Sequence, residues 1–182
     1  LQTQYELVEI YARSSWILAH SSVNIPIVET SDAEMQKMSN LTTAPEVLAV
    51  VRYAQFIEIP HNIPLALYLD SISDPGNMGT IIRTAEWYGI EHIFLSPLCV
   101  QIYNPKVVQA TMGSLFRVAV HTISFEKLMD LQKFKHILGA VLDGEPIENL
   151  KFEPSSLLVM GSESHGISAV NLPLLTQKLF IP

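Results

Sequence analysis

The larger, C-terminal part of the chain alternates short apolar runs with stretches of helical periodicity. The run over residues 63–69 is almost unbroken, which is typical of a strand buried on both faces. After it, Ile81, Ile82 and Ala85 recur at helical spacing, and Gly89 stands where a glycine often ends a helix. The same patterns predict further strands over residues 92–95, 116–120, 136–142, 157–160 and 179–181, and helices over 104–110, over 125–131 and near Val170.

Regular alternation of strands and helices predicts an α/β fold. Such a chain forms a mostly parallel sheet with helices on both faces, because each crossover helix must pack back onto the sheet. Ligands of open α/β sheets bind at the carboxyl ends of the strands. We therefore expect the functional residues in the loops that follow the strands.

The N-terminal part has a different pattern and predicts a separate small α/β unit over residues 1–53. Residues 5–11 alternate like a half-exposed strand, residues 31–41 resemble a capped helix, and residues 47–51 predict a buried strand. Residues 54–62 are then a connection, and residues 63–182 form the main domain.

Composition limits the function classes. With 182 residues, of which 48% are hydrophobic, the chain can bury the core of one full domain and a small one. The single Cys99 cannot form an intramolecular disulfide, and no Cys/His cluster has metal-ligand spacing, so we expect no metal site. No apolar run is long enough to span a membrane and no signal-peptide pattern is present, so we expect a cytoplasmic protein.

The formal net charge of −7 lowers the expected affinity for nucleic acid, because phosphate-binding proteins usually present lysines and arginines. A local basic site can coexist with a negative total, and Arg83, Lys106 and Arg117 are available for one. A dinucleotide-dependent dehydrogenase is excluded because no Gly-x-Gly-x-x-Gly follows the first strand.

The first segment with candidate chemistry follows the strand at 63–69. Asp74-Pro75-Gly76-Asn77 is typical of a turn, and it places Asn77 near the start of the next helix and Arg83 more than one helical turn later. This segment resembles the first motif of the SpoU, or TrmH, branch of the SPOUT RNA methyltransferases. That motif consists of a strand, Asp-Pro-x-Asn-x-Gly, and a helix containing Arg-Thr-Ala.

Later segments resemble further motifs of the same family. The strand at 157–160 leads into Gly161-Ser162-Glu163-Ser164-His165-Gly166, similar to a Gly-x-Glu-x-x-Gly motif. Residues 110–118 resemble an Ala-Ser-x-Gly-Ala segment, with Thr111 in place of Ser. Ile181-Pro182 resembles the start of a third motif, so the resemblance implies that the rest of that motif and a knot-forming tail would follow. Residues 1–53 resemble the latter part of a ribosomal-protein-like RNA-binding module.

The resemblance implies a trefoil-knot fold of the SPOUT type and methyl transfer from S-adenosylmethionine to a ribose 2′-hydroxyl of RNA. It also implies a homodimer acting on structured RNA, with ribosomal RNA favoured over transfer RNA. The expected catalytic residues are Arg83, Asn77 and Glu163, although Glu163 could instead be structural. The expected cofactor-binding residues are Leu142, Gly144, Gly161 and Ile181, with Thr111 and Gly113 as further candidates.

Arg83 presents a chemical difficulty as a base, because a guanidinium group stays protonated in proteins. We therefore prefer a role in which Arg83 binds the adjacent phosphate and orients the hydroxyl, while a phosphate oxygen or water takes the proton. A noncatalytic RNA-binding protein of the same fold is the alternative; it would not require Asn77 and Arg83 together. We interpret Trp87 as a helix-packing residue rather than a platform for RNA bases.

Overall fold

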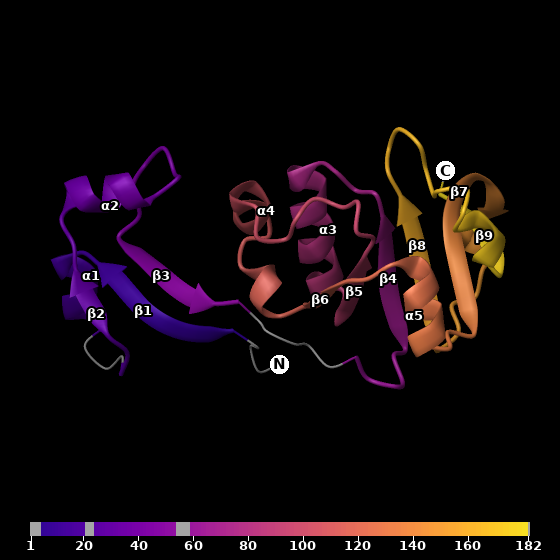
Figure 1. Ribbon diagram of the computed structural model, residues 1–182, viewed down its shortest axis with the longest axis horizontal. Helices are drawn as coiled ribbons and strands as arrows, with labels where there is room; N and C mark the ends of the chain where they lie inside the picture. The colour runs from indigo at the N-terminus through magenta and orange to yellow at the C-terminus, as the bar shows by residue number, and fades with distance from the viewer. Residues whose placement is uncertain (1–4, 21–23, 54–58, 182) are drawn as a thin grey trace. The chain divides into compact units, whose positions relative to one another are not determined.

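A computed structural model describes residues 5–20, 24–53 and 59–181, and the chain divides into two compact units between residues 56 and 57 (Figure 1). Residues 54–58 of the predicted connection lie outside the described residues. Among the described residues, no helix is long and apolar enough to cross a membrane.

The smaller unit has a three-stranded sheet with the order β2-β1-β3. Strand β1 pairs parallel to β2 and antiparallel to β3. Ser31 caps helix α2 by accepting from the backbone N–H of Glu34, whose carboxylate accepts from the N–H of Ser31. The elements are β1 (Glu6–Ala12), α1 (Ser14–Ala19), β2 (Ile27–Glu29), α2 (Asp32–Met38) and β3 (Val47–Arg52).

Three of these elements were predicted, and α1 and β2 were missed. The prediction that residues 47–51 form a buried strand is wrong in its burial, because every residue of β3 is exposed or only half-buried and Val50 is 38% exposed. The reason is that β3 lies at the edge of the sheet and pairs only with β1. An apolar run therefore indicated the strand here but not its environment.

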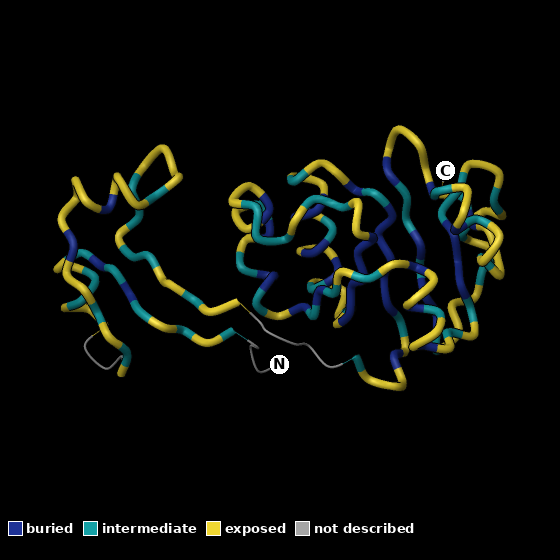
Figure 2. Tube along the Cα trace, viewed as in Figure 1, coloured by how far each residue is buried: buried dark blue, intermediate teal, exposed yellow. Residues whose placement is uncertain are grey.

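The larger unit contains a parallel sheet whose six strands, within residues 59–181, have the order β6-β5-β4-β8-β7-β9. Strand β4 lies inside the sheet, and its last five residues are all buried, as predicted (Figure 2). The strands are β4 (Leu65–Asp70), β5 (His92–Leu95), β6 (Ala119–Thr122), β7 (His136–Pro146), β8 (Ser156–Gly161) and β9 (Gln177–Phe180).

The helices of this unit agree closely with the sequence patterns. Gly89, just after α3, has φ of +73°, as its place at the helix end predicted. The predicted strand at 116–120 begins only at Ala119, because a 3-10 helix occupies the residues before Arg117. A short helix was predicted near Val170, and a 3-10 helix begins two residues after it. The helices are α3 (Pro75–Trp87), α4 (Pro105–Ala110), η1 (Ser114–Phe116), α5 (Phe125–Leu131), η2 (Ile147–Asn149) and η3 (Leu172–Leu174).

The order of the strands explains why helices cover both faces. From β4 the chain adds β5 and then β6 in one direction, and it then crosses over the sheet to β7 through α5. Right-handed crossovers in opposite directions put their helices on opposite faces. Phe125 of α5 accordingly packs against Tyr68 at a ring-centroid distance of 4.6 Å, in a core with Phe94, Leu128 and Val159.

A pair of stacked histidines lies at the edge of this core. His92 of β5 and His121 of β6 approach within 3.3 Å (Nδ1 to Nε2), and Phe94 stacks on His121 with ring centroids 5.0 Å apart. Burial, followed by the proximity of His92, lowers the pKa of His121 to about 4. Burial also lowers the pKa of His92, against an opposing effect of Glu91.

This pair predicts acid sensitivity of the folded state. In the unfolded chain His121 binds a proton below about pH 6.5, whereas in the folded chain it stays neutral down to about pH 4. The stabilisation is therefore complete above pH 6.5 and lost between 6.5 and 4, on the order of 1–2 kcal/mol after allowing for solvent screening. Urea unfolding from pH 7.5 to pH 4 should show a smaller loss of stability in H121F than in the wild type. The exposed-histidine control H61N should behave like the wild type; equal losses in all three proteins would contradict the assignment.

Candidate functional site

The candidate site lies at the carboxyl ends of β4, β8, β7 and β9, next to the point where the strand order reverses. After β4 the chain passes through α3 to β5, which pairs with one side of β4, while β8 pairs with the other side. Such reversal points leave a crevice in open α/β sheets, because successive loops diverge there. The two segments with candidate chemistry follow β4 and β8.

The start of α3 positions Asn77. Asp74 is the N-cap and accepts from the backbone N–H of Asn77 at 2.7 Å, and Pro75 occupies the first helical turn. Residues 74–77, which the sequence predicted as a turn, are thus the N-cap and the first helical residues of α3. The side-chain amide Nδ2 of Asn77 donates a hydrogen bond to Oε1 of Glu163. Two residues that are 86 positions apart, and that sequence motifs singled out separately, therefore meet.

A tight loop after β8 holds Glu163. Ser162 and Gly166 form an isolated antiparallel bridge, and the Gly166 N–H donates to the Ser162 carbonyl at 2.8 Å. A Cβ atom on Gly161 would lie 1.9 Å from the carbonyl carbon of Gly166, so a side chain there cannot be accommodated. Gly166 itself has φ of +65°. The two glycines of the motif therefore close the loop that presents Glu163 to solvent.

Asp70 connects these two segments, and sequence reasoning missed it. It ends β4 and is 3% exposed, and its Oδ2 accepts from the Ser168 N–H at 2.9 Å and from Nδ2 of Asn171 at 2.8 Å. Burial raises the pKa of Asp70, but hydrogen bonds from Ser168, Asn171 and Ser71 outweigh it and hold the pKa below its usual value. The sequence feature that could have indicated this role is the position of Asp70, a charged residue at the end of an apolar strand.

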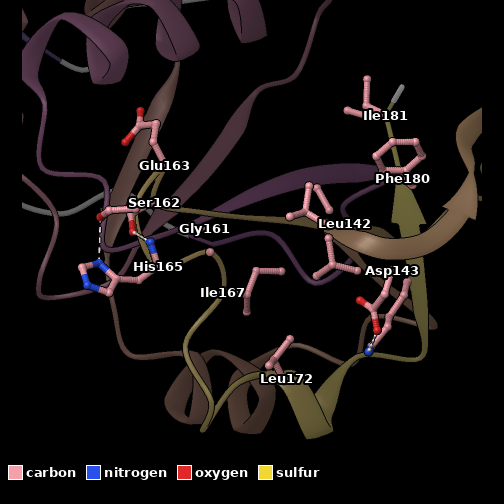
Figure 3. A pocket seen from close by; sticks show the side chains of 15 residues that line it. Leu142, Asp143, Gly161, Ser162, Glu163, His165, Ile167, Leu172, Phe180 and Ile181 are labelled. Carbon is pink, nitrogen blue, oxygen red and sulfur yellow. Dashed lines mark hydrogen bonds and ion pairs between the residues drawn. The ribbon is translucent and has the colours of Figure 1, made fainter.

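A pocket of about 670 Å³ opens beside this loop (Figure 3). Its wall on β7 is formed where the β7–β9 ladder breaks: Ala140 and Glu145 both pair with Leu179, so residues 141–144 loop out. In Figure 3, Ser162, Glu163 and His165 lie on one side of the pocket and Leu142, Phe180 and Ile181 on the other. The pocket thus combines an apolar wall with a polar rim.

The predicted cofactor-binding residues fall into two groups. Leu142, Gly161 and Ile181 line the pocket, and Leu142 is 92% exposed. Gly144 does not line it but allows β7 to return to β9, since its Cβ would lie 2.3 Å from the carbonyl carbon of Leu179.

Thr111 and Gly113 are not among the residues that line the pocket. Thr111 is fully buried and donates its hydroxyl to the Val108 carbonyl at 2.8 Å, and Gly113 is the N-cap residue of η1, with φ of +86°. They follow the contact of α4 with α3, where a Cβ on Gly79 would lie 2.4 Å from Cβ of Ala110. Structural roles account for what the structure shows of both, because Thr111 lies at the contact of α3 with α4 and Gly113 has the left-handed conformation that favours glycine.

Arg83 lies on the exposed side of α3. Within the described residues, no hydrogen bond or ion pair involves its guanidinium group, whereas Arg117 is paired with Glu86 at 2.7 Å. At the far side of the pocket, Lys178 pairs with Asp143 at 2.8 Å, which lowers the pKa of Asp143. No group of three or more His, Cys, Asp or Glu in the described part of the chain is placed to hold a metal ion.

Comparisons with known proteins find relatives over much of the chain. Residues 64–182 match the model of the SpoU rRNA Methylase family. A tRNA/rRNA methyltransferase of Synechocystis that is otherwise uncharacterised is 31% identical over 155 residues, which are 81% of this chain and 56% of that protein. A Bacillus subtilis 23S rRNA (guanosine-2′-O)-methyltransferase, RlmP, is 29% identical over 64% of this chain and 48% of its own length. The chain thus spans about half the length of these relatives.

Solved structures have the same fold. A protein from Porphyromonas gingivalis described as an RNA methyltransferase of the TrmH family superposes with a TM-score of 0.83 and 32% identity, over 98% of this chain and 74% of that one. The SpoU methyltransferase AviRb of Streptomyces viridochromogenes, solved with S-adenosylmethionine, superposes with a TM-score of 0.81 over the same shares of both chains. At 21% identity, the second likeness concerns the fold alone.

The Asp70 contacts predict a large stability effect. D70A leaves the Ser168 N–H and the Asn171 amide without an acceptor in a buried site, so unfolding free energy should fall by about 2–4 kcal/mol. Urea unfolding of D70A, N171A and the double variant measures the coupling. The double variant should lose clearly less than the sum of the single losses, because both remove the same hydrogen bond. Strict additivity would contradict the contact.

Proposed function

Because this chain belongs to the SpoU rRNA methylase family, we propose that it transfers a methyl group from S-adenosylmethionine to a ribose 2′-hydroxyl of RNA. The observation that carries this proposal is the hydrogen bond between Asn77 and Glu163 at the rim of the pocket. It joins the two segments that resemble family motifs. Fold likeness alone would not support an activity, since one fold serves many functions.

The pocket suits S-adenosylmethionine. Its volume of about 670 Å³ is in the range of small-molecule sites, and its walls are mainly apolar with a few polar groups at the rim. Leu142, Ile181 and Phe180 would contact the adenine ring, and backbone groups near Gly161 would bind its polar edge or the ribose. Bound there, the cofactor supplies a methyl group on a positively charged sulfur, which is already a strong electrophile.

The protein residues then have to position the hydroxyl and help it lose its proton. Arg83 would bind the phosphate next to the target ribose, because the planar guanidinium group can donate two parallel hydrogen bonds to phosphate oxygens. A guanidinium group stays protonated in proteins, so Arg83 is a poor general base. Asn77 holds one carboxylate oxygen of Glu163. This contact favours a positioning role for Glu163, while a phosphate oxygen or water takes the proton.

The remaining parts of the proposal concern partners. Structured RNA is the expected substrate, and the name of the relative RlmP, a 23S rRNA methyltransferase, favours ribosomal RNA. A homodimer, a trefoil knot and a cytoplasmic location are further expectations from the family resemblance. The alternative is a noncatalytic RNA-binding protein of the same fold, which would not require Asn77 and Arg83 together.

Binding of S-adenosylmethionine tests the proposed pocket. In calorimetric titrations, L142D should weaken binding at least tenfold, because it replaces the apolar wall by a charge. Leu98 is a matched control, since it is also a highly exposed leucine, at 77%, and does not line the pocket. L98D should bind like the wild type. Absence of any binding to the wild type would refute the methyltransferase and favour the alternative.

The role of Arg83 is tested by the dependence of methyl transfer on pH. A phosphate-binding role predicts that R83A lowers turnover on ribosomal RNA about 100-fold while cofactor affinity stays within threefold. R83K should retain part of the activity with an unchanged pH profile, because lysine keeps the charge but not the two-pronged geometry. If Arg83 were the base, R83K would shift the profile toward the lower pKa of lysine.

A further inference from the structure

Trp87 is an exposed aromatic residue at the end of α3. The interpretation of Trp87 as a helix-packing residue is wrong, because it is 83% exposed, whereas Met78, Ile82 and Ala85 form the buried side of the helix. Placing an indole ring in water forgoes a large hydrophobic gain. A packing role therefore does not explain this residue.

The exposed side of α3 is continuous with the candidate site. Asn77, Thr80, Arg83, Thr84 and Trp87 are all exposed and recur three or four positions apart, so they share one side of the helix. At 1.5 Å per residue, Trp87 lies about 15 Å along the axis from Asn77 and about 6 Å from Arg83. We call this set of five residues the α3 ridge. It begins at the residue that contacts Glu163.

The charges of the α3 ridge favour a polyanion. Its charged residue is Arg83, whose guanidinium has no partner among the residues that the structure describes. The nearby Glu86 accepts from Arg117 at 2.7 Å and from the Ser114 hydroxyl at 3.0 Å, and these contacts, led by Arg117, lower its pKa. The negative charge of Glu86 is thus balanced by the positive charge of Arg117. The guanidinium of Arg83 can bind a phosphate, the hydroxyls of the two threonines can bind a sugar, and the indole of Trp87 can stack on a base.

We propose that the α3 ridge binds single-stranded RNA beside the target nucleotide, with Arg83 on a phosphate and a base stacked on Trp87. This inference rests on the proposed function, since it makes the ridge the path by which RNA enters the site. Exposed aromatic side chains stack unpaired bases of any sequence, and an adjacent cation adds to the binding. The acidic total charge makes stacking the larger contribution here, because unspecific attraction to phosphate is weak.

Fluorescence measures this contact directly. The chain has two tryptophans, so W16F leaves Trp87 as the sole tryptophan. Titration of W16F with an oligo(A) 12-mer should quench its emission, and an abasic 12-mer with the same phosphates should not. By fluorescence anisotropy of labelled RNA, W87A should bind oligo(A) about 5- to 100-fold more weakly, with binding of the abasic strand unchanged.

Controls separate this surface from the cofactor site and from other partners. L131A, which truncates an exposed leucine of α5, should bind oligo(A) like the wild type. R83A should weaken binding of both strands. W87A should bind S-adenosylmethionine normally, so failure of the ridge is distinguishable from failure of the methyltransferase proposal.

Three results would overturn the proposal. Equal oligo(A) affinity of W87A and wild type would exclude stacking, and so would absence of quenching in W16F. Conversion of a dimer to a monomer by W87A in analytical ultracentrifugation would make the ridge a contact between two copies of the chain.

Discussion

The buried carboxylate of Asp70 is the constraint on which the site depends. A charge buried without a cation is costly unless hydrogen bonds satisfy it, and here a backbone N–H and a side-chain amide from residues 168–171 do so. Asp70 ends the strand that leads to α3, while residues 168–171 directly follow the Glu163 loop. One side chain thus links the end of β4 to the segment after the Glu163 loop. Pairing of β4 with β8, with Asp70 opposite Gly161, places the two loops side by side, and there Asn77 contacts Glu163.

Close backbone approaches complete the arrangement. Gly79 allows α4 to lie against α3, Gly161 allows the Glu163 loop to fold back on itself, and Gly144 brings β7 back to β9 after the looped-out residues 141–144. In each case a Cβ atom would meet another atom at 2.4 Å or less, so even alanine would force the chain apart. Of these glycines, Gly144 and Gly161 shape the pocket, because a side chain at either position would displace a segment that forms its wall.

The parts of the structure that sequence predicted are those set by local patterns. Continuous apolar runs identified β4, β5 and β8, and Gly89 identified the C-terminal end of α3. The segment from Asp74 to Asn77 was predicted as a turn, and the structure shows that Asp74 is the N-cap of α3. What the patterns missed depends on distant partners: the exposure of β3 at a sheet edge, the acceptor role of Asp70, and the exposure of Trp87. Motif resemblance singled out Asn77 and Glu163, but only the fold brings them together, and their roles stay a proposal.

The net negative charge of the chain can be related to the ion pairs that the structure shows. Several cations of this chain are neutralised by local pairs, such as Arg117 with Glu86 and Lys178 with Asp143, so they add little long-range attraction to phosphate. Among the residues that the structure describes, Arg83 has no hydrogen-bond or ion-pair partner, and it lies on the same side of α3 as Asn77. If the chain acts on RNA as proposed, selectivity for a site has to come from contacts with bases and sugars, because phosphate contacts alone carry no sequence information.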